Sequence, residues 1–219
     1  MWYRRPSRSQ TVGKGRDISR LLKLYRRVNK PRLDALLNGF RNFKTLEETI
    51  RIAALGIDAN GKRHGHQRRL SKSVLERAAA KLRRAIDEIA SSHSFDDLLD
   101  TVQRSTKTLK GFGELARYDT ALRIGAHMGI YPTKVYLHAG TRKGARALGF
   151  RLRSRDLEIA ELPMPLQNLP AHEIENFLCI YKEDLEGEHR LSRKRGGSCG
   201  GHKDRIPSLV NCGHGRIRL

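Results

Sequence analysis

Apolar residues recur at steps of three and four along most of the chain between residues 17 and 185. This spacing places them on one face of an α-helix. The clearest faces combine Ile18, Leu21, Leu22, Tyr25 and Val28; Leu33, Leu36, Leu37 and Phe40; Val74, Leu75, Ala78, Leu82, Ile86 and Ile89; and Ile174, Phe177, Leu178 and Tyr181. No segment has the strict alternation of a half-buried strand. The pattern therefore predicts an all-α fold, a multi-helix bundle over residues 17–185.

Helix starts can be placed by their capping residues. A serine or threonine followed three residues later by glutamate is typical of a capping box, in which each residue satisfies a free backbone N–H group. Thr45–Glu48 and Ser73–Glu76 have this pattern, and Ser94 precedes another apolar helix face. Pro31 suits the first turn of a helix, where its missing N–H costs nothing. We expect one long helix to begin at Ser73.

The middle of the chain predicts two helices joined by a tight turn. Apolar faces run through residues 95–102 and 115–126, and Leu109-Lys-Gly-Phe-Gly113 lies between them. Both glycines are expected to adopt positive φ and to permit close approach of another backbone. Phe112 is expected to fill the space between the helices. The N–H groups that open the second helix, from Gly113 to Leu115, favour an anion.

Leu109, Gly111, Phe112 and Gly113, with the apolar helices on each side, resemble the hairpin of the helix-hairpin-helix family. The resemblance implies contacts with DNA backbones that do not read sequence. An ordinary helical hairpin with a glycine turn is the alternative. Two longer blocks, at 118–126 and 135–149, resemble an uncharacterised bacterial protein family, and this resemblance implies no activity.

Charge makes nucleic acid the expected partner. Lys and Arg number 44 against 23 Asp and Glu, so the formal net charge is +21. A polyanion compensates such an excess. An anionic membrane is the rival partner, but no apolar run approaches the ~20 residues of a spanning helix. The hairpin favours DNA over RNA, although an RNA- or ribosome-associated basic protein is an alternative. We expect a basic N-terminal arm at 1–16 and a basic tail at 186–219.

Cations beside glycine turns and in loops are the candidate phosphate contacts. A polar loop carries Arg63, Arg68 and Arg69, and Lys110 lies in the hairpin. A second glycine turn is expected at 140–144, with Gly140 setting the turn. Arg142 and Lys143 would then begin a short helix, where cations oppose the helix dipole unless an anion is bound. A surface helix with two incidental cations is the alternative. Both glycine turns are expected to contact phosphates.

Some helix-hairpin-helix proteins are base-excision enzymes, which implies a second candidate function, a DNA glycosylase acting on a flipped base. In the bifunctional members a catalytic lysine follows the hairpin closely, and an aspartate lies about twenty residues further on. Leu115 occupies the lysine position here, and Thr133 the expected place of the aspartate. Asp119 is the remaining candidate base, with Tyr118 as a wedge. Asp119 and Arg123 can instead form an ordinary i,i+4 ion pair.

Three cysteines cannot all pair within the chain. The N-terminus lacks the apolar core of a secretory signal. We therefore expect a cytoplasmic protein. In the tail, Cys199-Gly-Gly-His202 and Cys212-Gly-His214 place two Cys and two His in pairs. Two such pairs can hold zinc tetrahedrally. A zinc knuckle and a disordered basic tail are the two interpretations of this segment.

Overall fold

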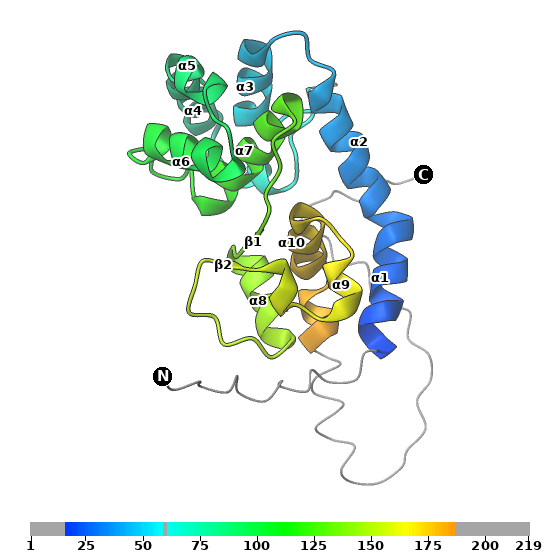
Figure 1. Cartoon of the computed structure of the whole chain (residues 1–219). Helices are drawn as coiled ribbons and strands as arrows, with labels where there is room; N and C mark the ends of the chain where they lie inside the picture. The colour runs from blue at the N-terminus through cyan, green and yellow to red at the C-terminus, as the bar shows by residue number, and fades with distance from the viewer. Residues whose placement is uncertain (1–15, 59–60, 187–219) are drawn as a thin grey trace, which may run out of the picture.

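The computed structural model of the chain describes residues 16–58 and 61–186 (Figure 1). It is mostly helical, as the sequence pattern predicts. The helices are α1 (Arg16–Val28), α2 (Lys30–Arg41), α3 (Leu46–Leu55), α4 (Lys72–Arg84), α5 (Ile86–Ala90), α6 (Phe95–Thr106), α7 (Glu114–Met128), α8 (Ala139–Ala147), α9 (Met164–Gln167) and α10 (Ala171–Ile180). Short 3₁₀ turns occur at His66–Arg69 and Ile159–Glu161. The arm at 1–15 and the tail at 187–219 lie outside the described residues.

The apolar interior is divided into two clusters. One is built by α2 to α7, and the other by α1, the strands and helices α8 to α10. Figure 1 shows α1 and α2 running in succession along both groups, so these two helices tie the clusters together. Polar contacts reinforce the link, because Lys30 in α2 forms an ion pair with Glu173 in α10 at 2.6 Å. The Tyr181 hydroxyl also donates to Asn29 Oδ1 at 2.9 Å.

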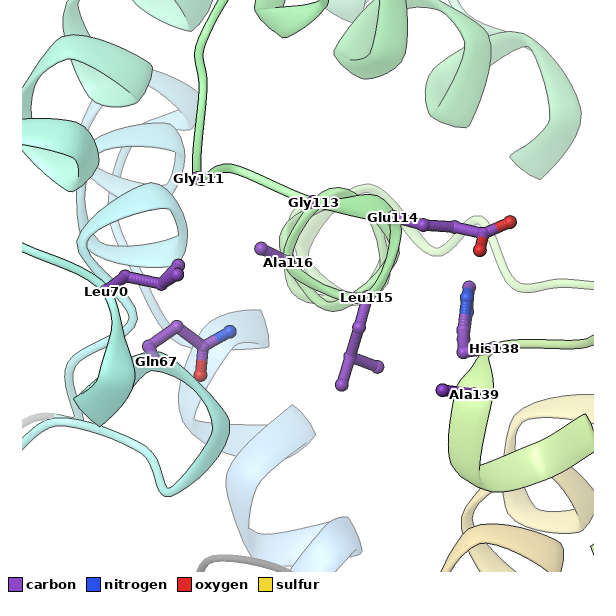
Figure 2. A pocket seen from close by; sticks show the side chains of 9 residues that line it. All are labelled: Gln67, Leu70, Gly111, Gly113, Glu114, Leu115, Ala116, His138 and Ala139. Carbon is purple, nitrogen blue, oxygen red and sulfur yellow. The ribbon is translucent and has the colours of Figure 1, made fainter. Parts of the chain in front are cut away.

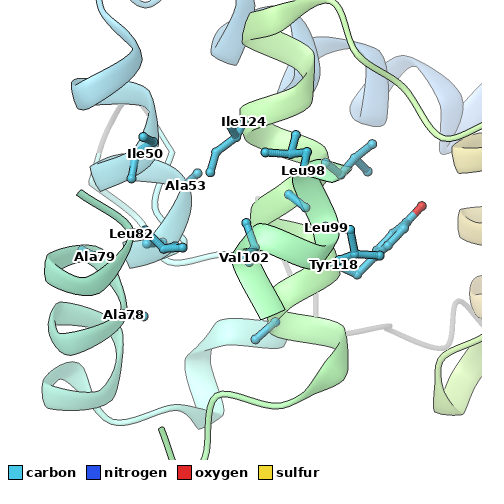
Figure 3. Close-up of a cluster of buried hydrophobic side chains, with 14 of the residues drawn as sticks. Ile50, Ala53, Ala78, Ala79, Leu82, Leu98, Leu99, Val102, Tyr118 and Ile124 are labelled. Atoms are coloured by element: carbon cyan, nitrogen blue, oxygen red, sulfur yellow. The ribbon is translucent and has the colours of Figure 1, made fainter. Parts of the chain in front are cut away.

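Helix α7 is the centre of the first cluster. It packs against α2, α3 and α6, and Figure 3 shows Leu98, Leu99 and Val102 of α6 beside it. Most of its residues from Ala116 to Ala126 are buried on several sides. A helix held this way by its neighbours presents its N-terminal end, at the α6–α7 hairpin, in a fixed position.

Helix starts agree with the sequence in two of three places. Thr45 accepts a hydrogen bond from the Glu48 N–H, and Ser94 forms a full capping box with Asp97. The predicted start at Ser73 is wrong. Ser71 is the cap of α4, and its hydroxyl accepts from the Val74 N–H at 3.3 Å. Both serines precede the same apolar face, so the box spacing alone selected the wrong one.

Two further expectations are corrected by the structure. The single helix expected from Ser73 to Ile89 breaks at Ala85, which ends α4 and precedes α5. The region expected to lack strands contains an antiparallel pair, β1 (Val135–Tyr136) and β2 (Asp156–Leu157). Each strand has two residues, which is too short for a period-two pattern to show in the sequence. The pair holds residues 155–157 beside residues 135–137, just before α8.

Candidate nucleic-acid interface

The hairpin between α6 and α7 has a buried apolar side and an exposed glycine side. Phe112 is 1% exposed and belongs to the first apolar cluster, with Leu109 also buried. The Phe112 N–H donates to the Leu109 carbonyl at 3.2 Å and closes the turn. Gly111 has φ +90°, which confirms the prediction for that glycine. Gly113 has φ −79° and ψ −176°, so the prediction of positive φ there is wrong.

Gly113 is the N-cap of α7, and no side chain of the described residues caps this helix. The first N–H groups of a helix have no partner within it. Lys110, Gly111 and Gly113 are exposed on the same turn. A Cβ on Gly113 would meet no heavy atom of residues 16–58 and 61–186 within 4 Å, so these residues leave open space over the helix start. The arrangement offers backbone donors and one lysine to an anion.

A cleft of about 310 Å³ lies between the hairpin and the start of α8. Figure 2 shows Leu115 projecting between Gln67 and Leu70 on one side and His138 and Ala139 on the other. His138 is the N-cap of α8, which also lacks a side-chain cap. Two uncapped helix starts therefore border one cleft. The structure brings the hairpin close to residues 138 and 139, which directly precede the second predicted phosphate contact at 140–144.

A second cleft, of about 350 Å³, is lined by Gln103, Glu114, Arg117, Arg142 and Arg155. Arg117 is fixed by two hydrogen bonds to Thr106, to its hydroxyl and to its carbonyl, each at 3.2 Å. Arg142, a predicted phosphate contact, thus lies beside the start of α7. Sequence reasoning missed Arg117 and Arg155. Arg155 reaches this cleft because β2 pairs with β1, and no pattern in the sequence predicted that pairing.

The glycines of α8 allow close helix packing and do not form the predicted turn. Gly140 lies inside the helix, where a Cβ would approach Cys179 Sγ to 2.6 Å, and a Cβ on Gly144 would meet the Leu178 carbonyl. They allow α8 to pack closely on α10, so the prediction that Gly140 sets a turn is wrong. Lys143 pairs with Glu183 at 2.7 Å and with Glu186 at 3.4 Å. Its charge is thereby largely neutralised within the protein.

The basic loop adjoins the first cleft through Gln67 and Leu70. Arg68 and Arg69 are exposed, as a phosphate contact requires. Arg63 is half-buried, and its Nη1 donates to the Leu70 carbonyl at 3.0 Å. Arg63 therefore braces the loop, whereas Arg68 and Arg69 remain the cations that a ligand can reach.

Asp119 takes part in a buried polar network. Its Oδ2 accepts from Gln67 Nε2 at 3.0 Å and lies 3.8 Å from Arg123 Nη2. The Arg123 guanidinium is buried and donates further hydrogen bonds to Gln67 Oε1 and to the Ala53 carbonyl. Burial lowers the pKa of Arg123, and Asp119 opposes this effect. An unpaired buried charge is costly. The Asp119 carboxylate therefore has a structural role, because it compensates the buried charge of Arg123.

Tyr118 lies inside an aromatic cluster rather than at the surface. It is 1% exposed, and its ring centroid lies 4.5 Å from that of His138 and 5.7 Å from that of Phe95. Burial raises the pKa of its phenol well above the ordinary value, so the group stays neutral. A ring in this position cannot wedge into DNA without leaving the core.

The predicted zinc ligands, Cys199, His202, Cys212 and His214, lie outside the described residues. Within 16–58 and 61–186, no group of three or more Asp, Glu, His or Cys side chains is placed to hold a metal. No helix of the described part is long and apolar enough to cross a membrane.

Comparison with protein-family models, with curated proteins and with solved structures finds no match.

Proposed function

We propose that the protein binds DNA through its phosphate backbone, with the α6–α7 hairpin acting as a helix-hairpin-helix contact. The observation that carries this proposal is the exposed glycine turn at an uncapped start of α7. Anions bind at such helix starts because several N–H groups and the helix dipole point at them. Phosphate oxygens of a nucleic acid are the anions that a chain of net charge +21 attracts most strongly.

The mode of contact supports binding without sequence preference. Phosphate contacts position a protein on DNA, whereas base contacts specify sequence. The hairpin offers main-chain N–H groups and Lys110, and none of these distinguishes one base from another. Leu109 and Phe112 are buried beneath the turn. The donors are therefore held in place before the ligand arrives, which reduces the entropy lost on binding.

Binding is favoured over base excision by the surroundings of the candidate catalytic groups. Asp119 is engaged by Gln67 and Arg123, and Tyr118 is buried. The position of the bifunctional enzymes' lysine is Leu115, which projects into the first cleft (Figure 2). DNA rather than RNA is proposed because the hairpin resembles a DNA-binding one, and RNA is included as an arm of the test.

The test compares fluorescence anisotropy of labelled duplex DNA of two unrelated sequences, duplex RNA and single-stranded DNA. We expect equal affinity for both DNA sequences and weaker binding of RNA. Lys110→Ala should weaken both DNA complexes alike, and Lys44→Ala serves as a matched control because Lys44 is an exposed lysine between α2 and α3. A strong sequence preference, tighter binding of RNA, or equal effects of the two lysine variants would overturn the proposal.

A further inference from the structure

We infer that the second cleft is a binding site for a phosphate dianion, the form carried by a phosphomonoester at the end of a nucleic-acid strand. The assignment to a strand end rests on the proposed function, whereas the preference for a dianion does not. Five residues from four segments line the cleft: Gln103 of α6, Glu114 and Arg117 of α7, Arg142 of α8, and Arg155 directly before β2.

The charges in the cleft are unbalanced. Three arginines and one acidic residue, Glu114, line it. In the described part of the chain, no ion pair joins Glu114 to Arg117, Arg142 or Arg155, and no other carboxylate lines the cleft. Like charges held close together destabilise a fold by mutual repulsion. Two net positive charges remain for a ligand to compensate.

A terminal phosphate matches this excess better than an internal one. A phosphomonoester carries about −1.5 to −2 at pH 7, and a phosphodiester within a strand carries −1. The monoester also presents three terminal oxygens, which several guanidiniums can share through paired N–H donors. The cleft of about 350 Å³ has room for a phosphate group at the end of a strand.

The arginines are positioned before any ligand binds. Arg117 donates two of its five N–H groups to Thr106, and Arg142 donates to the Ser154 carbonyl at 3.5 Å. Arg155 is anchored through its backbone, because its carbonyl accepts the Leu137 N–H at 2.8 Å. The remaining donors are available to an anion. The restrained side chains of Arg117 and Arg142 lose less entropy on binding than free ones.

The experiment uses the full chain with short duplexes of one sequence that end in a 5′-phosphate, a 3′-phosphate or a hydroxyl. We expect at least one phosphorylated end to bind about tenfold or more tightly, the order of one additional charged hydrogen bond. Arg142→Gln and Arg155→Gln should reduce this preference to near unity. Arg153→Gln is the control, since Arg153 is an exposed arginine two residues from Arg155 and does not line the cleft.

A second arm titrates inorganic phosphate and a nucleoside monophosphate into the protein and follows ³¹P line width. Binding that Arg142→Gln abolishes supports the dianion site, even if no duplex binds and the proposed function fails. Equal affinity for all three duplex ends, together with no phosphate binding, overturns the inference. That result would leave backbone binding by the hairpin intact. Unchanged melting midpoints of the glutamine variants would show that the fold is preserved.

Discussion

Replacing Gly113 by aspartate separates the fold of the hairpin from its proposed function. Gly113 has φ −79° and ψ −176°, the extended conformation that N-cap residues adopt, and a side chain there meets open space. An aspartate in this position can accept hydrogen bonds from the N–H groups of α7. We expect Gly113→Asp to leave the fold unchanged or to stabilise it by a few tenths of a kcal/mol.

The same carboxylate should remove the phosphate contact. It would occupy the N–H groups that an anion needs and place a negative charge beside the phosphate. A hydrogen bond to a charged group contributes about 1.5–3 kcal/mol. Loss of one or two of them, with the added repulsion, predicts a reduction in affinity for duplex DNA of about 30-fold or more. Gly113→Ala should act in the same direction but more weakly, by about 1 kcal/mol.

The assay measures duplex affinity by anisotropy and stability by thermal melting on the same preparations. Gly39→Asp is the matched control. Gly39 is an exposed glycine of α2 whose Cβ would also meet no atom within 4 Å, and the change in net charge is the same. The reasoning is refuted if both aspartate variants weaken binding equally, because bulk charge alone would then explain it. A Gly113→Asp protein that binds like the wild type would also refute it.

Three other predictions concern the packing of α8, the burial of His172 and the zinc ligands expected from the sequence. Gly144→Ala should destabilise the fold by about 2 kcal/mol or more, since its Cβ would clash with the Leu178 carbonyl; an unchanged urea midpoint would contradict the close packing of α8 on α10. Burial lowers the pKa of His172 to about 4, so the folded state binds fewer protons than the unfolded one below pH ~6.5. The free energy of unfolding should therefore decrease as the pH falls from 6.5 to 4, by up to about 3 kcal/mol from this group. Denaturant midpoints of His172→Gln should depend less on pH in that window than those of the wild type. The tail should carry about one zinc per chain if it forms a knuckle, and metal analysis should find less in Cys199→Ser and Cys212→Ser; equal zinc in all three proteins, or none, excludes the site.

Local signals in the sequence were sufficient for most of the helical framework. The amphipathic faces of α1, α2 and α6 indicated the helices, because burial on one side imposes the 3.6-residue period. The turn at Gly111 was also predictable, since a buried Phe112 between two glycines leaves few other arrangements. These features depend on neighbours in the chain. A single sequence contains them directly.

Features that depend on distant contacts were not predictable. Gly140 looks like a turn residue in the sequence, but its lack of a Cβ serves the approach of Cys179, nearly forty positions away. Arg155 joins Arg117 and Arg142 only because two strands of two residues pair. Asp119 is a residue type that can act as a catalytic base. Only the structure shows that it neutralises the buried guanidinium of Arg123.

The most direct measurement of the central claim is the salt dependence of duplex DNA binding by the wild type, Lys110→Ala and Arg68→Ala. Release of counterions predicts a linear fall of log affinity with log salt, with a slope of about −0.9 for each phosphate contacted. Each variant should flatten this slope by about one unit, and Lys44→Ala should not. Affinity that does not change with salt, or identical slopes for all four proteins, would contradict binding through the phosphate backbone at this site.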